Sequence, residues 1–170
     1  MNKSMKAVVI REHGDADVLE IREVPRPEPG PGEILVRVAT SGVNRADLLQ
    51  RRGRYPVPAG YPEDILGLEY AGTVEKAASD VSESLGAPGL EVMGITGGGA
   101  YAQYVVVPAT TAVAIPQKMT VADAGAIPEV FMTAFDAVFL QEELTAGETL
   151  LVHAAGSGVG TAAIQLAHRA

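Results

Sequence analysis

The sequence contains no cysteine and no tryptophan among its 170 residues. Without cysteine, the chain can form neither disulfide bonds nor zinc sites built on thiolates. No apolar run reaches the roughly 18–20 residues that a membrane-spanning helix needs. Residues 1–6 are also not followed by the apolar stretch of a signal peptide. We therefore expect a cytoplasmic protein that contacts no membrane.

Positive charge is also scarce, with 13 Lys and Arg residues against 21 Asp and Glu residues and a net charge of −8. Nucleic-acid binding surfaces usually carry a basic stripe, so we expect no nucleic-acid partner. The one basic cluster, at residues 51–54, is interpreted as a solvated helix end. Aromatic residues make up only 5% of the chain, but 47% of its residues are hydrophobic, which is enough to build a folded core.

Most of the chain before residue 118 has the patterns of short β-strands, in which apolar and polar residues alternate. Proline- and glycine-rich connectors, such as residues 25–32, separate these segments. One helix is expected among them, with Asn44 as its N-cap and Gly53 at its end. The predicted strands cover residues 6–10, 18–24, 33–39, 70–77, 101–107 and 111–115.

Helical patterns follow in the remaining residues. Thr120 is expected to cap a helix over residues 121–126, and Pro128 to begin another. A final strand from Thr149 and a small-residue helix complete the chain. Strands followed by helices indicate two domains, which we place at residues 1–120 and 121–170. One face of the helix after Pro128 is expected to carry Phe131, Phe135, Val138 and Phe139.

The final strand and helix enclose a glycine-rich turn. Gly156, Gly158 and Gly160 leave room for phosphate oxygens to approach the backbone, and N–H groups at a helix N-terminus bind such oxygens. The turn is a variant of the G-x-G-x-x-G pattern, because Ala155 and Ser157 stand at its first two glycine positions. Alone it is a weak sign of dinucleotide binding. The residue that selects NAD or NADP lies about 20 residues further on, beyond residue 170.

Several sequence blocks, in their order, resemble the NAD(P)H-dependent quinone oxidoreductases of the medium-chain dehydrogenase/reductase superfamily. The branch most alike is that of the tumour-suppressor-inducible quinone oxidoreductases. The resemblance implies a mixed α/β fold, with a GroES-like β-rich domain followed by the first strand and helix of a Rossmann-type domain. Family members run to roughly twice this length, so we expect an N-terminal portion. The blocks are residues 42–48, 51–56, 65–72, 97–104, 126–135 and 153–160.

The resemblance also implies chemistry without a metal. Zinc alcohol dehydrogenases of the same superfamily need a Cys and a His as ligands, and Asn44 and Leu68 stand at those positions here. The expected reaction is hydride transfer from NADPH, with NADH left open, to a small quinone or activated alkene. A complete chain is expected to form a homodimer. The alternative is a non-catalytic GroES-like module that binds a partner or associates with itself.

The same resemblance assigns three catalytic residues. Asn44 would orient the nicotinamide and the substrate, Tyr55 would donate to a quinone oxygen, and Ser157 would act beside the cofactor. Each has a structural alternative: an N-cap for Asn44, a packed aromatic for Tyr55 and a tight turn for Ser157. The cofactor-binding residues would be Asn44, Met132, Thr133, Gly156, Ser157, Gly158, Val159 and Gly160.

Three further residues or segments have expectations of their own. Asp47 is expected to support the site through hydrogen bonds, His153 to end the final strand, and Met132 to fill the core. Residues 83–94 replace the Val-Gly-Asp-Arg-Val turn of the family, which predicts an altered local turn.

Overall fold

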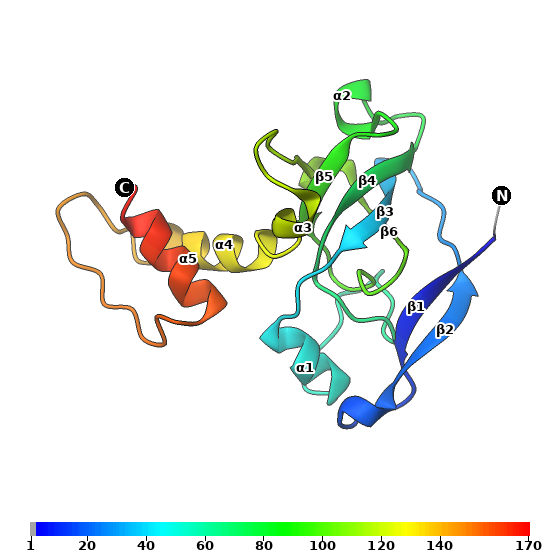
Figure 1. Cartoon of the computed structure of the whole chain (residues 1–170), viewed down its shortest axis with the longest axis horizontal. Helices are drawn as coiled ribbons and strands as arrows, with labels where there is room; N and C mark the ends of the chain where they lie inside the picture. Colours follow the sequence, from blue (N-terminus) through cyan, green and yellow to red (C-terminus); the bar gives the residue numbers. More distant parts are fainter. Residues whose placement is uncertain (1–2) are drawn as a thin grey trace. The chain divides into compact units, whose positions relative to one another are not determined.

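The computed structural model describes residues 3–170. It divides into two compact units, one that extends to Ala126 and one from Ile127 to Ala170 (Figure 1). Strands are confined to the first unit, and the second is built from helices and connecting segments. Within the described residues, the structure has no helix that is both long and apolar enough to cross a membrane.

A hairpin begins the first unit. Strands β1 (Ser4–Ile10) and β2 (Leu19–Pro25) pair antiparallel, joined by the short 3-10 helix η1 (Ala16–Val18). The first strand was predicted from a short apolar run and the second from its alternation, and both are confirmed. Backbone hydrogen bonds tie β1 to the rest of the unit, from Val8 N–H to the Tyr101 carbonyl at 2.8 Å and from Ile10 N–H to the Asp64 carbonyl at 2.7 Å.

A five-stranded antiparallel sheet forms the body of the first unit. Its spatial order is β6-β3-β4-β5-β7. The central strands β3 and β4 are largely buried, and their side chains form the main apolar core with those of β5 and β6. The strands are β3 (Glu33–Thr40), β4 (Glu69–Ala77), β5 (Glu91–Ile95), β6 (Tyr104–Pro108) and β7 (Val113–Ala114).

Strand β5 was missed by the sequence analysis, which treated residues 83–94 as an altered turn. A turn does remain there: helix α2 (Glu83–Gly86) leads to Gly89, whose φ of 93° suits glycine. The Gly89 N–H donates to the Val74 carbonyl at 2.9 Å. The substituted segment therefore still turns the chain, and β5 then pairs with β4.

Helix α1 (Arg45–Arg51) begins and ends where the sequence predicted. Asn44 precedes it, and Gly53 follows it with a φ of 69°. Two short helical elements, η2 (Ala109–Thr111) and α3 (Val121–Ala124), lie later in the unit. The Thr120 hydroxyl caps α3 as expected, accepting from the Asp123 N–H at 3.1 Å. Because α3 packs on β3 and β4, the first compact unit extends beyond residue 120.

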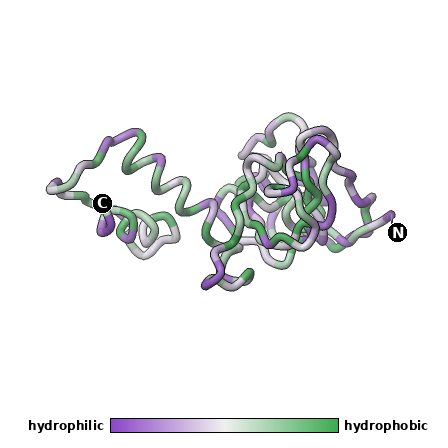
Figure 2. Tube along the Cα trace, turned by 90° about the horizontal axis from the view of Figure 1, so that it is seen from above, coloured by the Kyte–Doolittle hydropathy of each residue, from purple (hydrophilic) through white to green (hydrophobic). Residues whose placement is uncertain are grey.

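The second unit is a helical pair. Helix α4 (Pro128–Phe135) begins at Pro128 as predicted and continues into the π-helical segment η3 (Asp136–Gln141). It packs on α5 (Gly158–Ala167) through a small apolar cluster around Ala134, Val138 and Ala163. Figure 2 shows apolar residues, coloured green, along these helices. Phe131 and Phe139 pack on the cluster, but Phe135 is exposed, contrary to the expected shared core face.

The strand predicted from Thr149 is absent, and this prediction is wrong for the chain as described. Residues 149–152 have no regular structure, His153 lies in a turn, and Leu151 is 78% exposed. A strand forms only when its backbone groups bond to a neighbouring strand. The described residues of the second unit contain no other strand that could pair with it.

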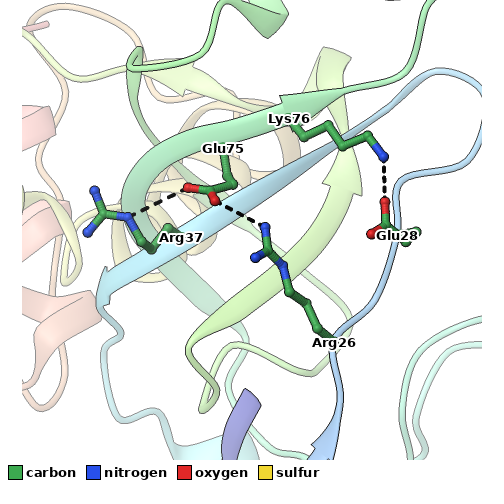
Figure 3. A network of polar contacts seen from close by, with 5 residues as sticks. All are labelled: Arg26, Glu28, Arg37, Glu75 and Lys76. Carbon is green, nitrogen blue, oxygen red and sulfur yellow. Dashed lines mark hydrogen bonds and ion pairs between the residues drawn. The ribbon is translucent and has the colours of Figure 1, made fainter. Parts of the chain in front are cut away.

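A polar network on the first unit connects the proline-rich connector to the sheet (Figure 3). Arg26 bonds to Glu75 at 3.1 Å, and its guanidinium lies 3.9 Å from the centre of the Tyr104 ring. Lys76 bonds to Glu28 at 2.5 Å, and this hydrogen bond lowers the pKa of the Glu28 carboxyl. Exposed pairs of this kind contribute little to stability, so the network mainly fixes the course of the connector.

Gly72 is needed where β3 and β4 pair, because a Cβ on it would lie 2.2 Å from the Arg37 carbonyl oxygen. We expect Gly72→Ala to lower the free energy of unfolding by roughly 2 kcal/mol, since backbone atoms must move apart. Urea denaturation measures this change. Gly30→Ala is the matched control, because its Cβ would meet only the flexible end of Glu33, and it should stay within about 0.5 kcal/mol of the parent. If Gly72→Ala had the same free energy of unfolding as the parent, the pairing of β3 with β4 at this position would be contradicted.

Candidate active site

The Asp47 carboxylate is the centre of the polar cluster in the first unit. Asp47 lies in the first turn of α1 and is only 2% exposed. Its Oδ2 accepts from the Asn44 backbone N–H at 2.7 Å and from the Tyr101 hydroxyl at 3.0 Å, and its Oδ1 accepts from the Gly67 N–H at 3.1 Å. Asp47 thus supports the site through hydrogen bonds, as the sequence predicted.

Tyr101 joins the cluster from the segment that precedes β6. Its hydroxyl donates to Asp47 and also lies 3.2 Å from the Gly42 carbonyl oxygen. Burial, and after it the negative charge of Asp47, raise the pKa of Tyr101 above the ordinary tyrosine range. The phenol therefore stays protonated and acts as a fixed donor rather than as a base.

Asn44 is held from two sides. Its backbone N–H bonds to Asp47, while its side-chain amide donates to the Glu69 Oε1 at 2.8 Å. Glu69 begins β4 and is buried, and its carbonyl accepts from the Ser41 hydroxyl at 2.6 Å. Asn44 therefore serves as the N-cap residue, its structural alternative, and its side chain is also fixed by Glu69.

Two glycines allow this cluster to close. A Cβ on Gly42 would lie 2.0 Å from the Glu69 Oε1, and a Cβ on Gly67 would lie 2.6 Å from the Tyr101 backbone nitrogen. Gly67 also has a φ of 102°, which residues with side chains rarely adopt. The glycines at 42 and 67 are thus fixed by close packing around the site.

Tyr55 lies outside this cluster. It follows α1 in a connecting segment, is 40% exposed and has its hydroxyl in no hydrogen bond to the described residues. It lines a cavity of about 500 Å³ together with residues of the segment from Gly53 to Val57, His13, Gln50 and Glu63. Tyr55 is therefore a cavity residue rather than a packed aromatic.

The predicted cofactor residues of the second unit gather at the N-terminus of α5. Ser157 is the N-cap, and its hydroxyl accepts from the Gly160 N–H at 3.0 Å. A Cβ on Gly160 would lie 2.5 Å from the Ala154 carbonyl oxygen, whereas one on Gly156 would meet no atom within 4 Å. Gly158 and Val159 form the first turn of the helix.

This arrangement fits a phosphate group, because an open glycine turn leads into a helix N-terminus. The structure gives the Ser157 hydroxyl a capping role at the start of α5.

Met132 and Thr133 lie on α4, the helix that packs on α5. Both are exposed, Met132 by 53%, so the expectation that Met132 fills the core is wrong. The core positions of this helix are taken instead by Val130 and Ala134. Among the described residues, no group of three or more His, Asp or Glu side chains is arranged to hold a metal ion.

The sequence analysis did not single out Glu69, Tyr101, Ser41 or Gln50. Glu69 had a visible signal, because it is the one charged residue in the apolar run of residues 65–72. A charge in a buried strand needs a partner, which points to a polar cluster. The other three have no such signal, because their partners lie far away in the sequence.

Comparison with known proteins gives a consistent result. A model of the alcohol dehydrogenase GroES-like domain matches residues 30–117. The polyketide synthase component PikAII of Streptomyces venezuelae is 41% identical over 155 residues, which cover 91% of this chain and 4% of that protein. The synaptic vesicle membrane protein VAT-1 homolog-like of Mus musculus is 35% identical over 164 residues, covering 96% of this chain and 39% of that protein.

Three solved structures share the fold. A quinone oxidoreductase from Coxiella burnetii is 31% identical with a TM-score of 0.85, covering 98% of this chain and 54% of that chain. The CurK enoyl reductase is 26% identical with a TM-score of 0.88, and the match covers 99% of this chain and 52% of that chain. A mycobacterial protein complexed with NADPH is 31% identical with a TM-score of 0.83, and the match covers 97% of this chain and 49% of that chain. The chain spans about half the length of these structures, and the mixed α/β, GroES-like fold expected from the sequence is confirmed.

Replacing Asp47 tests the centre of the cluster. We expect Asp47→Asn to lower the free energy of unfolding by roughly 3 kcal/mol, because an amide NH₂ would face buried donors. Urea denaturation followed by circular dichroism measures this change. The exposed Asp17 provides a control, since Asp17→Asn alters the same charge without a buried site. Equal stabilities of the two variants would contradict the assigned role of Asp47.

Alkaline pH should destabilise the first unit. The pKa of Tyr70 and that of Tyr101 are raised in the folded state, mainly by burial. Stability is therefore complete below the unfolded tyrosine pKa of about 10 and falls as the pH rises above it. Thermal unfolding across this range should show a shallower decline for Tyr101→Phe than for the parent. Tyr55→Phe, which removes an exposed hydroxyl, should lose stability with pH as the parent does. If Tyr101→Phe also declined as steeply as the parent, the raised pKa assigned to Tyr101 would be refuted.

Proposed function

We propose, since the chain belongs to the medium-chain dehydrogenase/reductase superfamily, that it carries the GroES-like part of an oxidoreductase that reduces a quinone or an activated alkene with NADPH and without a metal. The observation that carries the proposal is the position of Asn44, whose backbone N–H bonds to Asp47 and whose side-chain amide donates to Glu69. A polar side chain held in one orientation suits the positioning of a reactant, because small displacements of reacting atoms slow catalysis strongly.

The side chains of the first unit would position the electron acceptor. The Asn44 NH₂ group bonds to Glu69, and its side-chain carbonyl oxygen, which caps α1, has a second lone pair that would accept from a cofactor or substrate donor. Tyr55 is exposed beside a cavity, where its hydroxyl would donate to an acceptor oxygen as negative charge develops on it. Leu68, which stands at the position of a zinc-binding histidine, is buried and apolar, in keeping with metal-free chemistry.

The residues of the second unit would bind the cofactor. Gly156, Ser157, Gly158, Val159 and Gly160 would hold its phosphates at the start of α5, with Met132 and Thr133 of α4 on the nicotinamide side. When bound, NADPH supplies the hydride. Similarity to a protein complexed with NADPH supports this cofactor, and NADH stays the alternative.

The acceptor class is proposed from two kinds of relative. Similarity to a quinone oxidoreductase supports a quinone, and similarity to an enoyl reductase supports an activated alkene. Both are small molecules that accept hydride without strong Lewis-acid assistance. A homodimer, a cytoplasmic location and the assignment of residues 121–170 to a dinucleotide-binding domain belong to the same proposal.

A second candidate function is a binding module without catalysis. The second unit exposes apolar side chains, among them Leu140, Leu151 and Ile164, and a partner chain that covers them would shield this surface. Truncation after Ala126 separates the two functions, because α3 stays with the sheet that it packs on. The binding module would be favoured if the 170-residue chain associates with itself, the truncated chain does not, and no reductase activity is found.

The reductase proposal predicts a role for Asn44 in turnover. In a protein that joins this chain to a complete dinucleotide-binding domain, Asn44→Ala should lower kcat for NADPH oxidation with 1,4-naphthoquinone about 100-fold, because the reactants lose a positioning group. Arg45→Ala, at the exposed neighbouring residue, is the control and should retain activity. The assay follows NADPH absorbance with and without a zinc chelator. Loss of activity with the chelator, or no oxidation with quinones and enones alike, would refute the proposal.

A further inference from the structure

Gln50 is a buried residue whose polar atoms lack partners. It lies on α1, one helical turn after Asp47, and is 2% exposed. Neither its amide oxygen nor its amide nitrogen has a hydrogen-bond partner among the described residues. Buried polar groups in folded proteins are nearly always paired, and leaving them unpaired costs stability. Such a residue therefore needs an explanation: either its unpaired atoms lower the stability of the fold, or they bind a ligand.

The surroundings of Gln50 favour a ligand. Gln50 lies in the wall of the cavity of about 500 Å³ beside Tyr55, which we call the Gln50 cavity. A glutamine side chain has three rotatable bonds, so a change of rotamer would turn its amide toward this space. The rest of the lining is formed by His13, Gly53, Arg54, Tyr55, Pro56, Val57 and Glu63.

The chemistry of the lining defines the ligand. A glutamine amide presents a donor and an acceptor side by side, and the group that satisfies both has an acceptor next to a donor, as in another amide. Arg54 and Glu63 carry opposite charges, so the lining favours a neutral molecule. The exposed ring of Tyr55, with Pro56 and Val57, offers apolar surface for a planar body.

We propose that the Gln50 cavity binds a neutral, planar molecule that carries a carboxamide or similar amide edge, with Gln50 pairing with that edge and Tyr55 against its ring. The inference deepens the proposed function and rests on it for the role of this site, because Tyr55 lines the same cavity. The binding itself requires neither a cofactor nor hydride transfer. Gln50 is the specificity-determining residue of the cavity, since it alone among the lining residues is buried with both a donor and an acceptor unpaired.

Benzamide is the probe that tests this site, with methyl benzoate as a matched ligand that keeps the ring and the carbonyl but lacks the donor. Both are titrated into the 170-residue chain while side-chain amide signals are followed by NMR, the Gln50 signals being those lost in Gln50→Met. Benzamide should shift the Gln50 NH₂ and the Tyr55 ring signals. It should bind about tenfold more tightly than methyl benzoate, the effect of one net hydrogen bond.

Gln50→Met tests whether the amide itself binds, because methionine keeps the length and flexibility of the side chain without its polar atoms. It should weaken benzamide binding about tenfold and leave methyl benzoate binding unchanged. Gln117→Met, at an exposed glutamine, is the control and should bind both ligands like the parent.

Thermal unfolding of Gln50→Met provides a second measurement. The variant should unfold at the same or a higher temperature, because it removes unpaired buried atoms. A folded Gln50→Met that binds benzamide with parental affinity, or a parent whose Gln50 signals do not move, would overturn the proposal. A lower unfolding temperature would show that Gln50 already has a partner and would overturn it as well. Neither result depends on NADPH oxidation, so failure here and failure of the reductase proposal are distinguishable.

Discussion

The convergence of three donors on one buried carboxylate is the constraint on which the first unit depends. Asp47 receives the backbone of Asn44, the backbone of Gly67 and the phenol of Tyr101. These groups come from the start of α1, the segment before β4 and the segment before β6, so one side chain joins three connections of the sheet. A neutral replacement would leave buried donors unpaired, which is why this contact outweighs the exposed ion pairs around Glu75.

The position of the candidate site follows from this constraint. Asp47 fixes where α1 begins, and the start of α1 fixes Asn44, whose amide then reaches Glu69 at the start of β4. The close approach of these segments is possible only because positions 42 and 67 carry no side chain. The first unit thus contains a rigid polar cluster at the N-terminal end of α1 and, separately, a cavity beside Tyr55 that follows the helix.

The second unit shows the opposite situation, in which a local motif forms but its surroundings do not. The turn into α5 has its N-cap and its open glycine, so the N-terminus of the helix has the geometry that phosphates require. The segment before it, however, has no neighbouring strand to bond with, and Leu151 stays exposed. A helix satisfies its own backbone and needs only one packing partner, whereas a strand depends on segments distant in the sequence.

The sequence by itself determined the features that rest on local patterns. The caps at Asn44 and Thr120, the helix start at Pro128 and the strands β1 to β4 were all predictable, because neighbouring residues decide them. Family resemblance supplied Asn44 as a candidate site residue, whereas the glycine turn was visible in the residue pattern itself. Only the tertiary structure revealed β5, the partnership of Asn44 with Glu69 and the unpaired amide of Gln50. These depend on residues that are far apart in the chain, and long-range packing leaves no local pattern in a single sequence.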